Sequence, residues 1–239
     1  MKNIKKLVKT LAVSTIGLGI VTVSISEAQA VSLVPQREGE IKTNLGCLDP
    51  ANCIDTESEL GYKVTSFGFE DFDPSRLFSD DRGTTNNYAM GIEFILDEEG
   101  TRPDADQFYL RPVAFKNGQA VEDGRLEVGL FEFDFGRNIS EIKLDFFDVE
   151  YANSTKIFVD GQIVKTVASG ANSNIQSVVL KDLSKFTVQL GEPGGKFGTG
   201  DGVALQVSVP ESENFIGLSA LAVAGVLTLK RRKTASQKA

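Results

Sequence analysis

Residues 126–151, LEVGLFEFDFGRNISEIKLDFFDVEY, are the stretch that decides the expected fold class. Within it, Phe131, Phe133 and Phe135 alternate with acidic residues. Alternation with a period of two is typical of a β-strand that buries one face. Similar short runs recur between Gly, Asn and Asp residues, and helical periodicity is nearly absent from 60 to 208. The sequence therefore predicts an all-β domain, a two-layer antiparallel β-sandwich of jelly-roll type.

The apolar face of this stretch changes phase twice, between Leu130 and Phe131 and between Phe146 and Phe147. Such a switch indicates a bulge, a crossing between sheets, or burial on both faces of the strand. A sugar-stacking platform is the alternative role for the phenylalanines. Because such platforms favour Trp and exposed Tyr, and the chain has no Trp, we interpret the phenylalanines as core.

One predicted hairpin stands out among the strands. Asp160-Gly161 supplies the two positive φ angles that a type I′ turn requires, and apolar runs flank it on both sides. The predicted strands are 62–69, 89–96, 107–115, 125–135, 139–151, 155–159, 162–168, 174–180, 186–190 and 203–209.

Composition excludes several classes of function. The 239 residues include no histidine, which excludes Ser-His-Asp and Cys-His catalysis and any metal site with an imidazole ligand. The net charge is -8 although lysines and arginines gather at both ends, so the middle of the chain is strongly acidic. Such a surface repels phosphate, and a nucleic-acid partner is excluded.

The N-terminal thirty residues have the three-part pattern of a secretory signal peptide. Lysines precede an apolar run from Leu11 to Ile25, and the small residues Ala28 and Ala30 follow it. The run is shorter than the roughly 20 residues of a membrane-spanning helix. We expect signal peptidase to cleave after Ala30 and the protein to be exported.

The C-terminal end is expected to cross the membrane. Residues 215–229 form an uncharged apolar run without a polar stripe, which favours a transmembrane helix over a buried helix of the domain. By the positive-inside rule, the basic cluster that follows stays in the cytoplasm and residues 31–208 lie outside. This cluster is Lys230, Arg231, Arg232 and Lys233.

The order Val209, Pro210, Glu211, apolar helix and basic cluster resembles a PEP-CTERM sorting signal, which the membrane protease exosortase reads. The chain departs from that pattern at Ser212, where the family more often has a second proline. The resemblance implies transient anchoring, cleavage near Pro210 and Glu211, and release or attachment at the cell surface. A permanent single-span anchor is the alternative.

A second resemblance covers nearly the whole chain. Leu126-Glu-Val-Gly129 is similar to the signature of the LEVG family of cyanobacterial PEP-CTERM proteins, and residues 35–40, 44–50, 147–150 and 200–204 match that family in order. The resemblance implies a secreted or surface-sorted protein whose biochemical activity is unassigned. We expect five segments: a signal peptide (1–30), an N-terminal segment (31–60), the β-sandwich (61–208), a sorting signal (209–233) and a cytoplasmic tail (234–239).

Cys47 and Cys53 are the only cysteines. In an oxidising compartment, two cysteines with five residues between them are best explained by a disulfide that closes a small loop. A thiol metal or redox site is the alternative, but it lacks the two-residue spacing of thioredoxin-like motifs and further ligands for zinc.

Acidic clusters are the candidate metal sites. Carboxylates on loops suit Ca²⁺, which takes six to eight oxygen ligands and is abundant outside cells. The predicted calcium site is centred on Asp71, Asp73, Asp80 and Asp81, although none of the segments has EF-hand spacing. The alternative is a solvated acidic surface that keeps a secreted protein soluble.

Two further features are weighed as sites. The glycine-rich segment 191–202 lacks the order of a phosphate-binding loop and is interpreted as a binding-site rim with Asp201 as a ligand. Acidic residues on two predicted strands have the residue types that a glycosidase uses in pairs, although alternating acids are ordinarily the wet face of a strand. They are Glu127, Glu132, Asp134, Asp145, Asp148 and Glu150.

Two functions follow from these patterns. The first is a non-catalytic protein of the cell surface or extracellular matrix, processed by exosortase, that binds polysaccharide or matrix proteins with calcium assistance. The alternative is a carboxylate-based hydrolase of extracellular polysaccharide. The lack of His, Trp and a catalytic motif favours the first.

Overall fold

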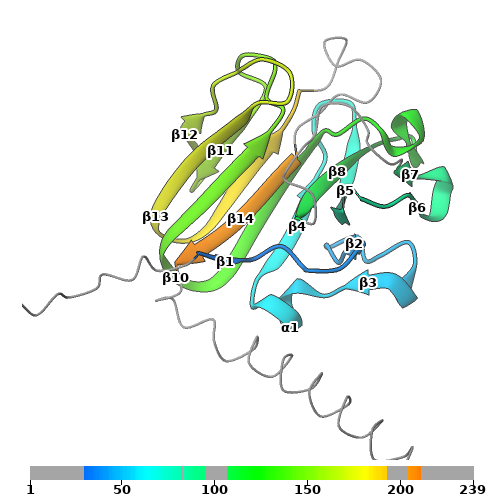
Figure 1. Cartoon of the computed structure of the whole chain (residues 1–239), viewed down its shortest axis with the longest axis horizontal. Coiled ribbons are helices and arrows are strands. Elements are labelled where there is room, and N and C mark those ends of the chain that lie inside the picture. The colour runs from blue at the N-terminus through cyan, green and yellow to red at the C-terminus, as the bar shows by residue number, and fades with distance from the viewer. Residues whose placement is uncertain (1–29, 82, 95–106, 193–203, 211–239) are drawn as a thin grey trace, which may run out of the picture.

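The computed structural model describes residues 30–81, 83–94, 107–192 and 204–210, and Figure 1 shows their course. Strands dominate these residues, and α1 (Thr56–Leu60) is the single α-helix among them. Asp55 caps the N-terminus of α1, and Gly61 ends it with a left-handed φ of 75°. The all-β fold class is confirmed.

Twelve of the strands form one sheet, in the order β12-β11-β13-β10-β14-β8-β5-β2-β3. Three short strands join this path from the side, β1 on β14, β4 on β10 and β9 on β8, and β6 pairs separately with β7. The bounds are β1 Ala30–Ser32, β2 Gly39–Ile41, β3 Cys53–Ile54, β4 Lys63–Phe67, β5 Asp73–Asp81, β6 Asn86–Asn87, β7 Glu93–Phe94, β8 Phe108–Lys116, β9 Gln119–Ala120, β10 Gly129–Phe147, β11 Lys156–Val159, β12 Gln162–Thr166, β13 Ile175–Leu190 and β14 Ala204–Pro210.

The long strands β10 and β13 run antiparallel along their whole length, as the sheet in Figure 1 shows. Two predicted strands merge in each, 125–135 with 139–151 and 174–180 with 186–190. The register shifts between Asp134 and Ile139, where Gly136 has a φ of 61°. The strand therefore bends instead of ending, because glycine adopts this backbone conformation without a steric penalty.

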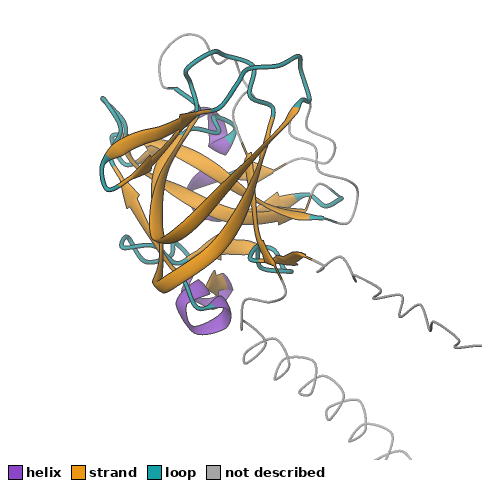
Figure 2. Cartoon of the chain, turned by 90° about the vertical axis from the view of Figure 1, so that its left-hand side faces the viewer, coloured by secondary structure: helices purple, strands orange, loops and turns teal. Residues whose placement is uncertain are grey.

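This bend lets one strand join two sets of partners. The first half of β10 pairs with β4 and the second half with β14. Figure 2 shows the sheet curling as a result. Side chains from both halves, among them Phe133 and Leu144, lie in the same large hydrophobic cluster.

The phase changes are explained by burial on both faces. Phe146 is buried in the large cluster, whereas Phe147 lies in a small cluster with Tyr109 and Ala204. Similarly, Val128 packs in a cluster separate from the one that contains Phe131. The phenylalanines of β10 are core, as their spacing predicts.

The Asp160-Gly161 hairpin is confirmed. Val159 of β11 pairs with Gln162 of β12, and the two turn residues have φ angles of 50° and 74°. Both angles are positive, which a type I′ turn requires.

The strand β5 differs from the sequence prediction, which places its acidic ends in or beside loops. Most of its residues are polar, yet Ser75 and Ser79 are buried together with the apolar Leu77 and Phe78. Their hydroxyls donate to the carbonyl oxygens of Val128 and Pro35, at 2.8 and 2.9 Å. A polar strand can lie inside the fold because each buried donor finds an acceptor. The predicted strand 89–96 is also shorter: β7 covers only Glu93–Phe94.

The N-terminal segment 31–60 contributes to the main sheet. β1 pairs with β14, β2 pairs with β5, and β3 extends the sheet in parallel to β2. In the part of the chain that the structure describes, no helix has the length and apolar character needed to cross a bilayer. The apolar run 215–229, its basic cluster and the signal sequence before Ala30 lie outside that part.

We predict that Phe133→Ala lowers the free energy of unfolding by about 3–5 kcal/mol, the usual range for truncating a buried phenylalanine. Phe133 is fully buried, and its ring stacks on Phe186 with centroids 5.1 Å apart. The measurement is urea unfolding of the full chain. Phe67→Ala, at a 39% exposed position of β4, is the control and should cost less than about 1 kcal/mol. Equal losses would contradict this assignment of the core.

Candidate functional site

A pocket of about 540 Å³ opens beside β2 and is the strongest candidate for a ligand site. Three separate segments build its walls: the start of β2, the disulfide loop, and β6 with the residues that follow it. Its volume lies within the range of small-molecule sites. The lining residues are Glu38, Gly39, Glu40, Leu48, Asp49, Asn52, Asn86, Asn87, Tyr88 and Ala89.

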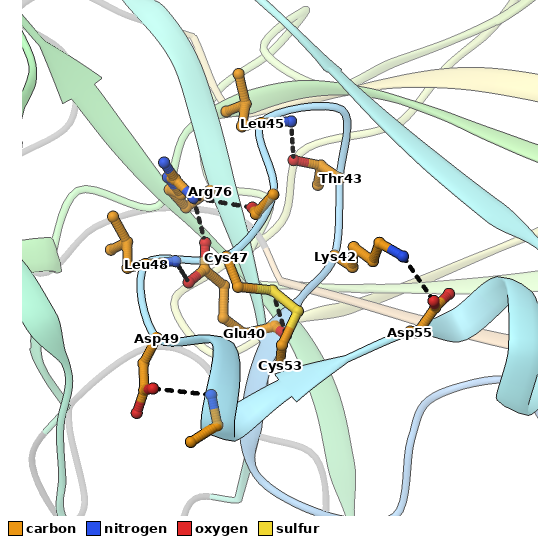
Figure 3. Close-up of a disulfide and its surroundings, with 12 residues drawn as sticks. Glu40, Lys42, Thr43, Leu45, Cys47, Leu48, Asp49, Cys53, Asp55 and Arg76 are labelled. Atoms are coloured by element: carbon orange, nitrogen blue, oxygen red, sulfur yellow. Dashed lines mark hydrogen bonds and ion pairs between the residues drawn. A yellow bond between two sulfur atoms is a disulfide. The ribbon is translucent and has the colours of Figure 1, made fainter.

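The disulfide between Cys47 and Cys53 forms, as the sequence predicts, and it holds one wall of the pocket. The loop that it closes contains Leu48, Asp49 and Asn52, which all line the pocket. Figure 3 shows Asp49 turning back onto its own loop, where its carboxylate accepts a hydrogen bond from the Ala51 amide at 2.9 Å. The wall is therefore fixed by a covalent bond and by a local cap.

A buried ion pair joins this loop to the sheet. The Glu40 side chain on β2 is almost fully buried, and Arg76 of β5 donates to its Oε1 at 2.6 Å. The amide of Leu48 donates to the other oxygen, also at 2.6 Å, and Arg76 bonds the Gly46 carbonyl (Figure 3). Burial raises the pKa of Glu40, while Leu48 and Arg76 oppose that rise.

The backbone of β2 comes unusually close to the opposite wall at Gly39. A Cβ atom at this position would lie 2.7 Å from the carbonyl oxygen of Asn52. A larger residue would push β2 and the disulfide loop apart, so glycine is needed for the narrow base of the pocket.

The third wall carries an unsatisfied hydroxyl. The Tyr88 ring packs against Phe78 and Phe94, with centroids 4.7 and 5.2 Å away. Its hydroxyl oxygen is buried and has no hydrogen-bond partner among the described residues. Burial, together with the charges of Asp80 and Glu38, raises the pKa of Tyr88, so the hydroxyl keeps its proton.

A buried charge network lies behind this wall. Arg111 of β8 is 2% exposed and stands between two carboxylates. Its Nε lies 2.9 Å from Glu127 Oε1, and its Nη1 lies 3.5 Å from Asp80 Oδ2. The guanidinium stacks over Phe94 at 4.1 Å, and the Tyr109 hydroxyl donates to Asp80 at 3.0 Å. The network joins β5, β8 and the residues before β10.

Asp80 has an abnormal pKa as a result. Burial raises its pKa, and this effect outweighs the opposing pull of Arg111 because the guanidinium is closer to Glu127 than to Asp80. The side-chain amide of Asn86, which lines the pocket, reaches Asp80 Oδ1 at 3.5 Å. The network therefore touches the pocket from behind.

The four aspartates of the predicted calcium site do not come together. Asp71 and Asp73 lie at the start of β5, where they bond Lys116 and the Gly118 amide. Asp80 and Asp81 lie at its other end, about eight strand residues or 25 Å away. The prediction of one centre from these four residues is wrong, because the segment between them is an extended strand. Among the described residues, no group of three or more Asp, Glu or Cys is placed to hold a metal ion.

Five of the six carboxylates considered for hydrolysis have structural partners in the described part of the chain. Glu127 pairs with Arg111, and Glu132 lies 3.2 Å from Lys185 across the β10–β13 ladder. Asp134 and Asp148 accept backbone amides, and Asp145 pairs with Lys143. These bonds stabilise strands and turns. None of these acids lines the large pocket.

The predicted sorting motif is described only in part. Val209 and Pro210 end β14 and pair with Val31 and Ala30 of β1. Glu211, Lys230, Arg231, Arg232 and Lys233 lie outside the described residues, as does Asp201 of the glycine-rich segment.

Sequence reasoning did not find the main residues of the pocket. Glu38, Asn86, Asn87 and Tyr88 belong to no motif and come from segments about 50 residues apart. The cysteine spacing was the one available signal, because it marked a shaped loop that forms part of the wall.

No family model matches the chain, and neither a curated protein nor a solved structure is significantly similar to it. The site must therefore be judged from its own geometry.

We predict that Asp80→Asn becomes more stable relative to the unchanged protein as the pH rises above 3.8. The raised pKa means that folded Asp80 binds a proton more readily than unfolded Asp80, so its contribution to stability is lost as pH rises through the folded pKa. Asparagine does not titrate. The measurement is urea unfolding of the unchanged protein and of each variant from about pH 2 to 7, a range that covers both sides of 3.8.

Asp55→Asn is the matched control, with the opposite sign. The hydrogen bond from Lys42 lowers the pKa of Asp55, so its contribution is present above 3.8 and is lost as pH falls through the folded pKa. The variant should therefore lose stability relative to the unchanged protein as pH rises toward 3.8. A common slope for both variants would refute the assignment.

We also predict that the double variant Cys47→Ser/Cys53→Ser loses about 2 kcal/mol of unfolding free energy, the usual gain from closing so short a loop. Denaturant unfolding with and without reductant measures it. The reductant should change the unchanged protein and leave the double variant unaffected. A reductant effect on both would point to a cause other than this disulfide.

Proposed function

We propose that this chain is an exported, non-catalytic binding module of the cell surface or extracellular matrix, and that the pocket beside β2 binds extracellular polysaccharide. The observation that carries the proposal is the pocket lining. Three carboxylates and three carboxamides surround about 540 Å³. Tyr88 forms part of the same wall, and its buried hydroxyl has no partner among the described residues.

The chemistry of this lining suits sugars. Carboxylates accept hydrogen bonds from hydroxyl groups, and each carboxamide both donates and accepts. A sugar ring presents neighbouring hydroxyls that can fill both roles, and bonds to carboxylates are the stronger ones. The described residues of the lining include no lysine or arginine, which disfavours anionic ligands such as phosphates.

The walls are also held in place before any ligand arrives. The disulfide, the Glu40–Arg76 ion pair and the close approach at Gly39 restrain two of them. A site that is already ordered loses less entropy on binding, which favours affinity for small flexible ligands.

The cellular address belongs to the same proposal. The sequence patterns support membership of the LEVG family of PEP-CTERM proteins, with a signal peptide, a transmembrane sorting helix and processing by signal peptidase and exosortase. Ala30 and Pro210, the residues next to the two expected cleavage points, pair with each other in the β1–β14 ladder. A single core shared by both halves of β10 supports a two-layer sandwich.

A hydrolytic role receives less support. The paired acids that the sequence offered are engaged with cations and backbone amides, and the pocket acid Glu40 has both oxygens occupied. A glycosidase needs two carboxyl groups facing one bond across a cleft. The chelator arm of the experiment below tests whether calcium takes part in binding.

The test is calorimetric titration of the purified full chain with polysaccharide from the producing cells, with calcium and then with a chelator. We expect binding, and we expect Ala89→Trp to abolish it, because Ala89 lines the pocket and a large ring would fill it. The polymer is then sized by chromatography.

Ala171→Trp is the control, since Ala171 is exposed and does not line the pocket. Binding that both tryptophan variants retain would move the site elsewhere. Shortened polymer would establish the hydrolase instead, and no binding would overturn the proposal. Loss of binding in chelator would show that calcium takes part.

A further inference from the structure

The pocket beside β2 has an unbalanced charge. Its described lining contains Glu38, Glu40 and Asp49 and no basic residue. Glu40 pairs with Arg76, but Glu38 and Asp49 contact no lysine or arginine among the described residues. Asp49 accepts bonds from Ala51 and Asn52, and Glu38 from the Thr84 hydroxyl, all uncharged donors. Two carboxylates at the pocket thus lack a cationic partner in the described part of the chain.

Carboxylates also lie behind the pocket. Asp80 shares Arg111 with Glu127, and the side-chain amide of Asn86 links Asp80 to the lining. Charges behind a wall of low dielectric act on the pocket more strongly than they would through water. A cation in the pocket would be attracted from both directions.

Tyr88 reports the sign of the charges at this wall. Its hydroxyl oxygen is buried, without a hydrogen-bond partner among the described residues. The carboxylates of Asp80 and Glu38 act on it more strongly than the opposing charge of Arg111 does. An ammonium group brings a positive charge and three donors, which match carboxylates.

We infer that the pocket selects a saccharide that bears a primary ammonium group, an amino sugar without its acetyl group. This inference rests on the proposed function, since it names the ligand class of the same site. The ring hydroxyls bind the carboxamides of Asn52, Asn86 and Asn87, and the ammonium group binds at the Glu38 and Asp49 side.

A bare metal ion fits the pocket less well. Ca²⁺ takes six to eight oxygens close together, whereas the described residues contain no group of three or more acidic or thiol ligands so placed. Both oxygens of Glu40 are already bonded. A larger organic cation with its own hydroxyl groups uses more of the 540 Å³.

The experiment titrates the purified full chain with two oligosaccharides of equal length, one of β-linked glucosamine and one of β-linked N-acetylglucosamine. They differ only in charge and in the acetyl group. We expect the glucosamine oligomer to bind about tenfold more tightly or better, since charge-assisted hydrogen bonds are the stronger ones. Its affinity should fall as salt is raised from about 50 to 500 mM.

Variants identify the charges involved. Glu38→Gln and Asp49→Asn keep the size and shape of each side chain, remove one charge each, and replace one acceptor oxygen by an NH2 group. We expect each to reduce the preference for glucosamine about tenfold. Glu141→Gln is the control, because it also removes one negative charge. Glu141 lies on β10, pairs with Lys181 on β13 and does not line the pocket. This variant should leave the preference unchanged.

The outcomes separate this inference from the function on which it rests. Equal affinity for both oligomers would overturn the charge selection and retain saccharide binding. A preference that Glu141→Gln also weakens would trace to net charge alone and would overturn the inference. If one calcium ion per chain competes with the oligosaccharide, the site binds a metal ion and the inferred ammonium ligand is wrong. Binding of neither oligomer, together with no binding of the native polysaccharide, would refute both proposals.

Discussion

The antiparallel pairing of β10 with β13 is the constraint on which the rest of the structure depends. The strand β10 bulges between Asp134 and Ile139, where Gly136 has a positive φ of 61°, and β13 continues past this point with Asp182 at a φ of 53°. Because of the bend, β4 and β14 share the edge of β10 that β13 does not occupy. The bend also brings both halves of the strand onto one core. Every other strand of the sheet is hydrogen-bonded to this pair either directly or through a series of intervening strands.

The pocket sits at the far end of that sheet, where β5, β2 and β3 follow one another. There polar bonds add to the apolar packing of Ile41, Ile54 and Phe78. Arg76 joins β5 to Glu40, Arg111 joins β8 to Asp80, and the disulfide closes the outer loop. Removing one member of a buried pair typically costs about 3–5 kcal/mol, because the other charge is left without compensation. The same bonds that stabilise this end thus fix the shape of the site.

Most of the fold near β10 could be predicted from sequence, because it produces two local signals. These are the alternation of apolar and polar residues along the strand and the Asp160-Gly161 turn. Prediction failed at β5, because its serines and charged residues have the composition of a loop. Ser75, Ser79 and Asp80 are buried only because other segments supply partners for them. Prediction failed again at the calcium site, since Asp73 and Asp80 are close in sequence but sit at opposite ends of an extended strand. The pocket was beyond prediction because its walls meet only after β2, β5 and β6 are placed.

The sequence by itself determined the all-β class, the core role of the phenylalanines, the turn at Asp160 and the disulfide. Each rests on neighbours in the chain, so local periodicity and spacing suffice. Tertiary structure alone decided that two predicted strands are one bent strand, which acids are paired, and that Glu38, Asp49 and Tyr88 share a pocket. These depend on contacts between distant segments, and a side chain's charge state and partners are set by what the fold brings next to it.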